Sequence, residues 1–155
     1  MKLIKSKKSL CAFLSALMAV GYIQPCTQTN AVNETVQKYE FENGSTNGGK
    51  IYNETWKGNT QEDGTGEDFD LTNASGGGFS YLDQKGTKVS VDVEVEETGL
   101  YELSICYCEP SDPNKKIQYL NINGVNQGEV CFVHNLTFEE TSGGVVMLQK
   151  GVNTI

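Results

Sequence analysis

The sequence contains no arginine, one histidine and one tryptophan, and these scarcities exclude several classes of protein. Nucleic acid and anionic membranes are bound by clusters of basic residues, which a chain with a formal net charge of −8 does not supply. Zinc sites need several closely spaced histidines and cysteines, so none is expected. The Gly-x-Ser-x-Gly motif of serine hydrolases is absent, and the 20 acidic residues identify no particular catalytic pair. We therefore do not expect this chain to be an enzyme.

The first 31 residues differ in composition from the remainder. Four lysines among the first eight residues precede the apolar run "LCAFLSALMAVGYI", which is too short for a membrane span. Small residues at Thr29 and Ala31 then offer a cleavage point. We predict a secretory signal peptide over residues 1–31 and a secreted, extracellular domain over residues 32–155, with an N-terminal anchor helix as the alternative. Removal of the peptide takes away four lysines and no acidic residue, so the net charge becomes −12, which suits binding of a hard cation.

Helical periodicity is almost missing beyond residue 31, and alternation of apolar and polar residues replaces it. Alternating segments lie at 88–96, 100–108, 117–124, 128–133 and 144–149, with a short strand near 51–52 and hairpin turns at 123–125 and 150–152. Such alternation predicts half-buried strands, and short strands separated by glycine- and asparagine-rich turns are typical of an all-β, antiparallel β-sandwich. The polar stretch 43–68 is predicted to be mainly a long surface loop, where binding residues are often found.

Three of the five cysteines lie beyond residue 31, and this odd number argues against a disulfide scaffold. A bridge from Cys131 to Cys106 or Cys108 requires that their strands pair; otherwise all three thiols are free. The last residues, "GVNTI", begin a new strand in which the sequence stops. We therefore expect a C-terminally truncated sandwich that lacks its last strand and belongs to a longer protein.

The stretch "KYEFENG", residues 38–44, alternates aromatic and acidic side chains. In a strand, Tyr39 and Phe41 share one face, and Glu40 and Glu42 share the other. Two carboxylates this close repel each other unless a cation lies between them. The residues alone leave two alternatives, a cation site or two solvated glutamates on an edge strand.

Five segments, in this order, resemble family 35 of the carbohydrate-binding modules and the related family 6. They are "YEFENG", "SGGGFSYLDQKGTKVSVDVEV", "TGLYELSICYCEP", "YLNINGVNQGEV" and "VVMLQKGVNTI". The resemblance runs from about Val36 to Ile155. The stretch "CYCEPSDPNKKIQYLNINGVNQGEV" is also similar to the mannan-binding branch found beside glycoside hydrolase family 26 mannanases.

This resemblance implies a jelly-roll sandwich of the galactose-binding type, with Glu40 and Glu42 as ligands of a structural calcium ion. It also implies a monomeric, non-catalytic module fused to a catalytic domain, an endo-β-mannanase, which the module tethers to plant cell-wall polysaccharide. Mannan is the first expectation for the ligand, and xylan or pectic sugars are alternatives.

Proteins bind sugars with an aromatic platform and a few polar groups that fix the orientation of the ring. Tyr81, Trp56 and Phe138 are the aromatic candidates, and His134 and Asn114 are the polar ones. Three of them have structural alternatives: a core residue for Tyr81, a loop anchor packed against the sandwich for Trp56 and a solvated turn for Asn114. The competing function is a secreted, calcium-stabilised protein-interaction or adhesion module without a sugar site, which does not need aromatic residues in its loops.

Overall fold

The computed structural model describes residues 1–5, 36–111 and 113–155, and none of these residues lies in an α-helix. The strands are β1 (Lys2–Lys5), β2 (Val36–Lys38), β3 (Ser45–Asn47), β4 (Lys50–Tyr52), β5 (Lys57–Asn59), β6 (Asp68–Asp70), β7 (Phe79–Tyr81), β8 (Lys88–Ser90), β9 (Asp92–Val95), β10 (Gly99–Tyr107), β11 (Lys115–Ile122), β12 (Val125–Val133), β13 (Glu139–Leu148) and β14 (Gly151–Thr154). Short 3₁₀ helices, η1 (Phe41–Asn43) and η2 (Ser75–Gly77), connect some of them. Within these described ranges, no helix has the length and apolar character needed to cross a membrane.

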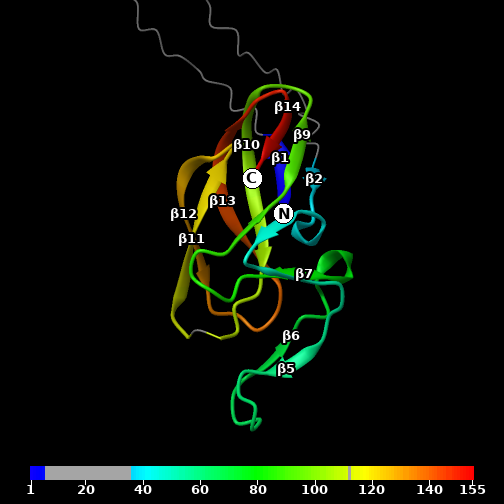
Figure 1. Cartoon of the computed structure of the whole chain (residues 1–155), viewed down its shortest axis with the longest axis vertical. Coiled ribbons are helices and arrows are strands. Elements are labelled where there is room, and N and C mark those ends of the chain that lie inside the picture. The colour runs from blue at the N-terminus through cyan, green and yellow to red at the C-terminus, as the bar shows by residue number, and fades with distance from the viewer. Residues whose placement is uncertain (6–35, 112) are drawn as a thin grey trace, which may run out of the picture.

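The strands form two layers, which confirms the predicted all-β sandwich (Figure 1). One layer is a four-stranded sheet in the order β13-β10-β1-β2, and all of its neighbours are antiparallel. The other contains the β9–β14 pair and the β11–β12 hairpin, which the hydrogen bond from Asn123 N to Thr154 O joins at 2.8 Å. The pairs β3–β8, β4–β7 and β5–β6 complete the fold, and Figure 1 shows β5–β6 projecting from the body as a separate hairpin.

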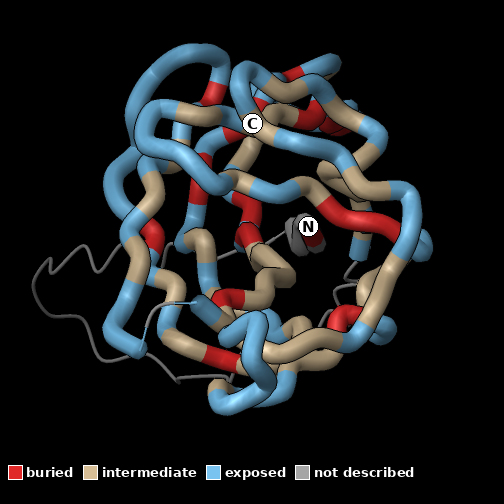
Figure 2. Tube along the Cα trace, turned by 60° about the horizontal axis from the view of Figure 1, so that its bottom comes forward, coloured by how far each residue is buried: buried red, intermediate tan, exposed pale blue. Residues whose placement is uncertain are grey.

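The hydrophobic core lies between the two layers, because alternate residues of facing strands point inward. Val93 of β9 and Leu103 of β10 are 0% and 2% exposed, whereas their neighbours Glu94 and Glu102 are exposed. The core cluster consists of Met1, Val91, Val93, Val95, Tyr101, Leu103, Ile122, Val146, Leu148 and Ile155. Figure 2 shows buried stretches on several strands, with long exposed stretches between them. Burial of a side chain such as Leu148 contributes about 1.5–3 kcal/mol.

Asn153 is fully buried, and its amide joins the turn after β13 to the turn after β11. Its Nδ2 donates to the carbonyl oxygens of Gln149 and Gly151 at 2.7 and 3.1 Å. Its Oδ1 accepts from the backbone N–H of Gln149 at 3.1 Å and from Nδ2 of Asn123 at 3.0 Å. All four hydrogen-bonding positions of this amide are used, so its burial leaves no unsatisfied polar group.

Strand β1 comes from the segment predicted to be a signal peptide, and it lies inside the four-stranded sheet. Leu3 pairs with Leu103 of β10 on one side and with Gln37 of β2 on the other. Met1 is 4% exposed and belongs to the core. Residues 1–5 thus lie in the sheet of this structure, and the division of the chain at residue 31 stays a prediction. The remainder of that segment, including the predicted cleavage point, lies outside the described residues, and its cleavage stays a prediction.

Two of the predicted strands are wrong in their extent. The alternation over 88–96 is divided at Val91, because the chain changes partner there: β8 pairs with β3, whereas β9 pairs with β14. In the stretch "KYEFENG", strand β2 ends at Lys38 and the chain turns through η1. Tyr39 and Phe41 nevertheless both pack against the core, as the alternation predicted.

The three cysteines beyond residue 31, Cys106, Cys108 and Cys131, are free thiols. Strand β12, which carries Cys131, pairs with β11, whereas β10 pairs with β1 and β13. The strands that a bridge would join are therefore not paired with each other, and the condition set for a disulfide is not met.

Candidate functional site

A cleft of about 880 Å³ opens between the layers, a volume within the range of ligand pockets in proteins. Three sets of side chains line it, and we refer to them as the aromatic group, the polar wall and the glutamate pair. The aromatic group is Tyr52, Trp56, Phe79, Tyr81 and Phe138; the polar wall is Glu109, Ser111, Lys116 and Gln118; the glutamate pair is Glu40 and Glu42.

The aromatic group brings together the three aromatic residues predicted to bind sugar. The ring centroids of Trp56 and Phe138 lie 5.0 and 5.8 Å from that of Phe79. The ring of Tyr52 lies 5.0 Å from Trp56 and 6.2 Å from Tyr81. Phe79 is 9% exposed and forms the buried centre, whereas Tyr81 is 44% exposed. A buried ring thus supports an aromatic surface that solvent can reach, at separations typical of aromatic pairs.

The register of β4 and β7 explains how Tyr52, Phe79 and Tyr81 come together. Tyr52 pairs with Phe79, and Lys50 pairs with Tyr81, two positions further on. Residues two apart on a strand share a face, so these side chains lie on the same side of the pair. Lys50 Nζ also lies 5.9 Å from the Tyr81 ring centroid and 2.8 Å from Asp83 Oδ2. The hydrogen bond from Lys50 Nζ to Asp83 Oδ2 raises the pKa of Lys50 and lowers the pKa of Asp83.

Loop hydrogen bonds hold the other two members of the aromatic group. The carbonyl oxygen of Trp56 accepts from the N–H of Leu71 at 2.9 Å. The side chain of Asn73 brackets Phe138: its Oδ1 accepts from the backbone N–H of Phe138 at 3.3 Å, and its Nδ2 donates to the carbonyl oxygen at 3.2 Å. Sequence reasoning did not identify Tyr52 and Phe79 as members, although their alternation with Lys50 and Tyr81 is the signal that could have placed them.

The polar wall is centred on Glu109, which is 9% exposed. Its Oε2 lies 2.8 Å from Lys116 Nζ, and its Oε1 accepts from the hydroxyl and the backbone N–H of Ser111 at 2.7 and 3.0 Å. Burial by itself would raise the pKa of Glu109, but the hydrogen bonds from Lys116 and Ser111 outweigh it and hold the pKa below its ordinary value. Sequence reasoning missed this wall because it placed the nearest strand at 117–124, although continuing its alternation backwards would have pointed Lys116 inward with Gln118.

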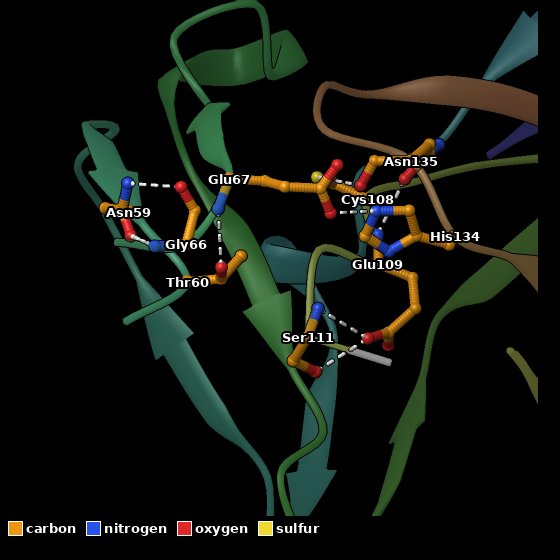
Figure 3. Close-up of polar contacts among 9 residues, drawn as sticks. All are labelled: Asn59, Thr60, Gly66, Glu67, Cys108, Glu109, Ser111, His134 and Asn135. Atoms are coloured by element: carbon orange, nitrogen blue, oxygen red, sulfur yellow. Dashed lines mark hydrogen bonds and ion pairs between the residues drawn. The ribbon is translucent and has the colours of Figure 1, made fainter. Parts of the chain in front are cut away.

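His134 and Asn114, the two predicted polar sugar ligands, are not among the described residues that line the cleft. Figure 3 shows His134 directed at Glu67, which follows the tip of the β5–β6 hairpin; His134 Nε2 lies 2.9 Å from Glu67 Oε2. The other ring nitrogen, Nδ1, is buried without a hydrogen-bond partner in the described part of the chain. Asn114 is exposed in the turn before β11. A sugar-binding role for these two residues stays a prediction.

The glutamate pair lies at another part of the cleft, where η1 approaches η2. Glu40 Oε2 accepts from the hydroxyl of Ser75 at 2.9 Å, and Glu40 Oε1 lies 3.3 Å from Lys38 Nζ. Glu42 Oε1 is buried and has no hydrogen-bond partner among the described residues. Burial, and to a lesser extent the charge of Glu40, raise the pKa of Glu42. A Cβ on Gly76, whose φ is +75°, would lie 2.7 Å from Glu42 Oε1, so this close approach requires glycine.

The glutamate pair fits part of a calcium site. Calcium takes six to eight oxygen ligands, and an unsatisfied, buried carboxylate oxygen is the ligand type that it prefers. Glu40, Glu42 and Ser75 together present side-chain oxygens from two segments of the chain. Residues 1–5, 36–111 and 113–155 contain no group of three or more histidine, cysteine, aspartate or glutamate residues suited to a metal ion.

No family model matches the chain. Two curated relatives from Piromyces sp are similar to 76% of it: mannan endo-1,4-beta-mannosidase B, 36% identical over 118 residues, and mannan endo-1,4-beta-mannosidase A, 34% identical over 118 residues. The chain spans only 18% and 16% of the lengths of these relatives. The predicted similarity to sequences associated with mannanases is confirmed at this level.

Two solved structures align with part of the chain. A Podospora anserina GH26-CBM35 β-(1,4)-mannanase aligns with a TM-score of 0.49 and 23% identity over 75% of this chain and 22% of its own. A ruminal GH26 endo-β-1,4-mannanase aligns with a TM-score of 0.47 and 25% identity over 64% of this chain and 22% of its own.

Proposed function

We propose that this chain is a non-catalytic carbohydrate-binding module, of family 35 or a related family, that holds an attached endo-β-mannanase on mannan. The observation that carries the proposal is its similarity to a segment that makes up only 18% and 16% of two mannan endo-1,4-beta-mannosidases. A match to so small a share of an enzyme fits an accessory module. The module raises the concentration of the attached enzyme at its substrate, which lies outside the cell, so we propose that the protein is secreted.

The side chains of the cleft support this proposal chemically. Apolar C–H faces of a sugar ring stack on aromatic surfaces, for which Tyr81 and Trp56 are the candidates. Sugar hydroxyls need both donors and acceptors, which Lys116, Glu109 and Gln118 supply on the polar wall. Each hydroxyl exchanges water for protein at little net gain, so we expect weak binding that depends mainly on the aromatic contacts.

Native affinity electrophoresis of the full chain tests this function. The gels contain galactomannan, glucomannan, xylan or no polysaccharide, and we expect retardation by both mannans. Tyr81→Ala removes an exposed stacking surface and should weaken binding about three- to tenfold. Ile117→Ala is the matched control: Ile117 is also 44% exposed but is not among the described residues that line the cleft. It should migrate like the wild type.

Each outcome of these gels has a defined meaning. Retardation by xylan alone would retain the carbohydrate-binding function and replace mannan as the ligand. Equal migration of the wild type in all gels would overturn the proposal and favour the protein-interaction module. Retardation that persists in both Tyr81→Ala and Trp56→Ala would remove the aromatic group from the binding site.

We also propose that Glu40 and Glu42 bind a structural calcium ion, which would offset the repulsion between them and satisfy the buried oxygen of Glu42. Thermal unfolding of the full chain, with a chelator and then with increasing calcium, tests this. At a hundredfold excess over the dissociation constant, binding adds about 2.7 kcal/mol to the free energy of unfolding. Glu42→Gln should lose most of this gain, and Glu129→Gln, an exposed control on β12, should keep it. An undiminished gain in Glu42→Gln would place calcium elsewhere.

A further inference from the structure

Four of the described asparagines stand in the motif Asn-x-Ser/Thr, in which the middle residue is not proline. They are Asn43, Asn53, Asn73 and Asn135; Asn33 begins a further motif of this kind, outside the described residues. The motif is the acceptor of N-glycosylation in eukaryotic secretory pathways. The curated relatives come from Piromyces sp, a fungus, and fungi secrete proteins through such a pathway. The four described asparagines differ in what their side chains already do in the fold.

The amide of Asn135 is part of the folded interior. Asn135 is 8% exposed. Its Oδ1 accepts from the backbone N–H of Glu109 at 2.7 Å, and its Nδ2 donates to the carbonyl oxygen of Tyr107 at 3.4 Å (Figure 3). These bonds join the loop after β12 to the end of β10. A glycan attached to Nδ2 needs a path to solvent, so a glycosylated Asn135 cannot occupy this position.

Asn73 is exposed, but the backbone of a distant segment occupies its amide. Its Oδ1 accepts from the N–H of Phe138 at 3.3 Å, and its Nδ2 donates to the carbonyl oxygen of Phe138 at 3.2 Å. These two bonds use the edge of the amide on which Oδ1 and one Nδ2 hydrogen lie side by side. The link to a glycan is a trans secondary amide, in which the sugar carbon replaces that hydrogen. A glycan on Asn73 would therefore displace Phe138, a member of the aromatic group.

Asn43 and Asn53 are exposed, and neither side chain forms a hydrogen bond to another described residue. Asn43 is the last residue of η1, and Asn53 lies in the bend that follows β4. Asn53 comes directly after Tyr52 of the aromatic group, but neither asparagine is among the described residues that line the cleft. A glycan at either position thus breaks no hydrogen bond of its asparagine and needs no space in the cleft.

We propose that Asn43 and Asn53 are N-glycosylation sites of this protein, and that Asn73 and Asn135 stay unmodified because the fold uses their amides. The glycan comes from an oligosaccharide carried on a lipid diphosphate. Nδ2 attacks the first sugar carbon, the N–C bond forms, the C–O bond to the diphosphate breaks, and Nδ2 releases a proton. This inference rests on the proposed secretion and not on the proposed sugar binding.

Mapping of the glycans in the full chain tests the proposal. The chain is placed behind the secretion signal of a yeast host, so that it enters the secretory pathway whatever residues 1–31 do. Protein with a native circular-dichroism spectrum is purified, unfolded, treated with peptide N-glycosidase in water enriched in heavy oxygen, and digested. Each glycosylated asparagine becomes an aspartate labelled with heavy oxygen, which mass spectrometry locates. We expect label at Asn43 and Asn53, and none at Asn73 or Asn135.

Variants of the motif at Asn53 separate glycosylation from other effects of substitution. Asn53→Gln and Thr55→Ala each destroy the motif and should each remove one glycan, seen as one step in mobility on a denaturing gel. Glu54→Gln is the matched control, because it keeps the motif and should keep the glycan. Asn43→Gln should remove the other glycan.

Substitution of the two asparagines that the fold uses should have the opposite pattern. Asn73→Gln and Asn135→Gln should leave the number of glycans unchanged. Each should lower the midpoint of thermal unfolding by a few degrees, because hydrogen bonds to the backbone of Phe138, or of Glu109 and Tyr107, are lost. Asn53→Gln breaks no such bond, and after enzymatic removal of the glycans it should unfold at the same temperature as the wild type.

Absence of label at both Asn43 and Asn53, in cells that glycosylate a control secreted protein, would overturn the proposal. Absence at one of them would overturn the assignment of that site. Label at Asn73 or Asn135 in natively folded protein would also overturn the proposal, since that amide would then carry a glycan within the fold. No polysaccharide is used, so these outcomes are independent of the proposed binding function.

Discussion

Glu109 and Glu42 place carboxylate groups in the same cleft, but only one of them is satisfied by its surroundings. Both oxygens of Glu109 are engaged, one by Ser111 and the other by Lys116 at 2.8 Å. Glu42 Oε1 is buried and has no hydrogen-bond partner among the described residues. The pKa of Glu109 is accordingly lowered, whereas burial raises the pKa of Glu42.

Glu109 is thus a structural carboxylate, whereas Glu42 needs a proton or a cation to satisfy its buried oxygen. A buried carboxylate that is fully hydrogen-bonded can remain charged at modest cost, whereas an unpaired one is destabilising until it is protonated or meets a cation. Glu109 therefore acts as part of the wall of the cleft. The unsatisfied oxygen of Glu42 is the physical reason for proposing a cation at the glutamate pair.

The largest expected effect comes from removing Glu109. Glu109→Ala leaves Lys116 and the N–H of Ser111 without their partner, and we expect the free energy of unfolding to fall by about 2–3 kcal/mol. The loss stays below that of a fully buried ion pair because the side chain of Lys116 is 38% exposed. Urea unfolding at pH 7 measures it, and Glu129→Ala, on the exposed face of β12, should change stability by less than about 0.5 kcal/mol. If Glu109→Ala also costs less than about 0.5 kcal/mol, the hydrogen bonds of Glu109 to Lys116 and Ser111 do not stabilise the fold as we infer.

The pH dependence of stability tests the charge of Glu109, with a smaller expected effect than its removal. The folded state lowers the pKa of Glu109, so its contribution is complete above the unfolded value near 4.5 and is lost as the pH falls through the folded value. Glu109→Gln should therefore cost about 1–2 kcal/mol at pH 7 and progressively less below pH 4.5. Urea unfolding of both proteins between pH 7 and pH 3 measures this difference. A difference that does not change with pH would show that the charge of Glu109 is not what stabilises the fold.

Most of the strands could be predicted from the sequence because their cause is local. Alternation in "LYELSICYC" predicts β10 nearly to its ends, since each apolar side chain faces the core wherever the strand lies. The pairing partners of a strand are not determined locally. The division of 88–96 at Val91 arises because β8 pairs with β3 and β9 pairs with β14, and no pattern within 88–96 specifies these partners.

The candidate site was predictable only in part, for the same reason. Aromatic residues expected in loops or at strand ends suggested Tyr81, Trp56 and Phe138, but their meeting at Phe79 depends on the packing of distant segments. The placement of β1 was not foreseen, because composition marks a signal peptide and says nothing about an open position in a sheet. Sequence patterns thus identified residue types suited to the chemistry, while tertiary packing decided which of them face one cleft.

The smallest expected effect is a gain in the free energy of unfolding rather than a loss, and it tests the comparison of Glu42 with Glu109 most directly. The folded state raises the pKa of Glu42, so above the unfolded value near 4.5 its ionised form weakens the fold. In a chelator, Glu42→Gln should therefore raise the free energy of unfolding, by at most about 0.5 kcal/mol because solvent screens a partly exposed group. Repeated urea unfolding at pH 7, with Glu129→Gln as the control, measures this gain. With calcium added, the sign should reverse, since the variant then lacks a ligand. If Glu42→Gln destabilises the protein in a chelator, Glu42 is satisfied within the fold like Glu109, and the reason for proposing a cation there no longer holds.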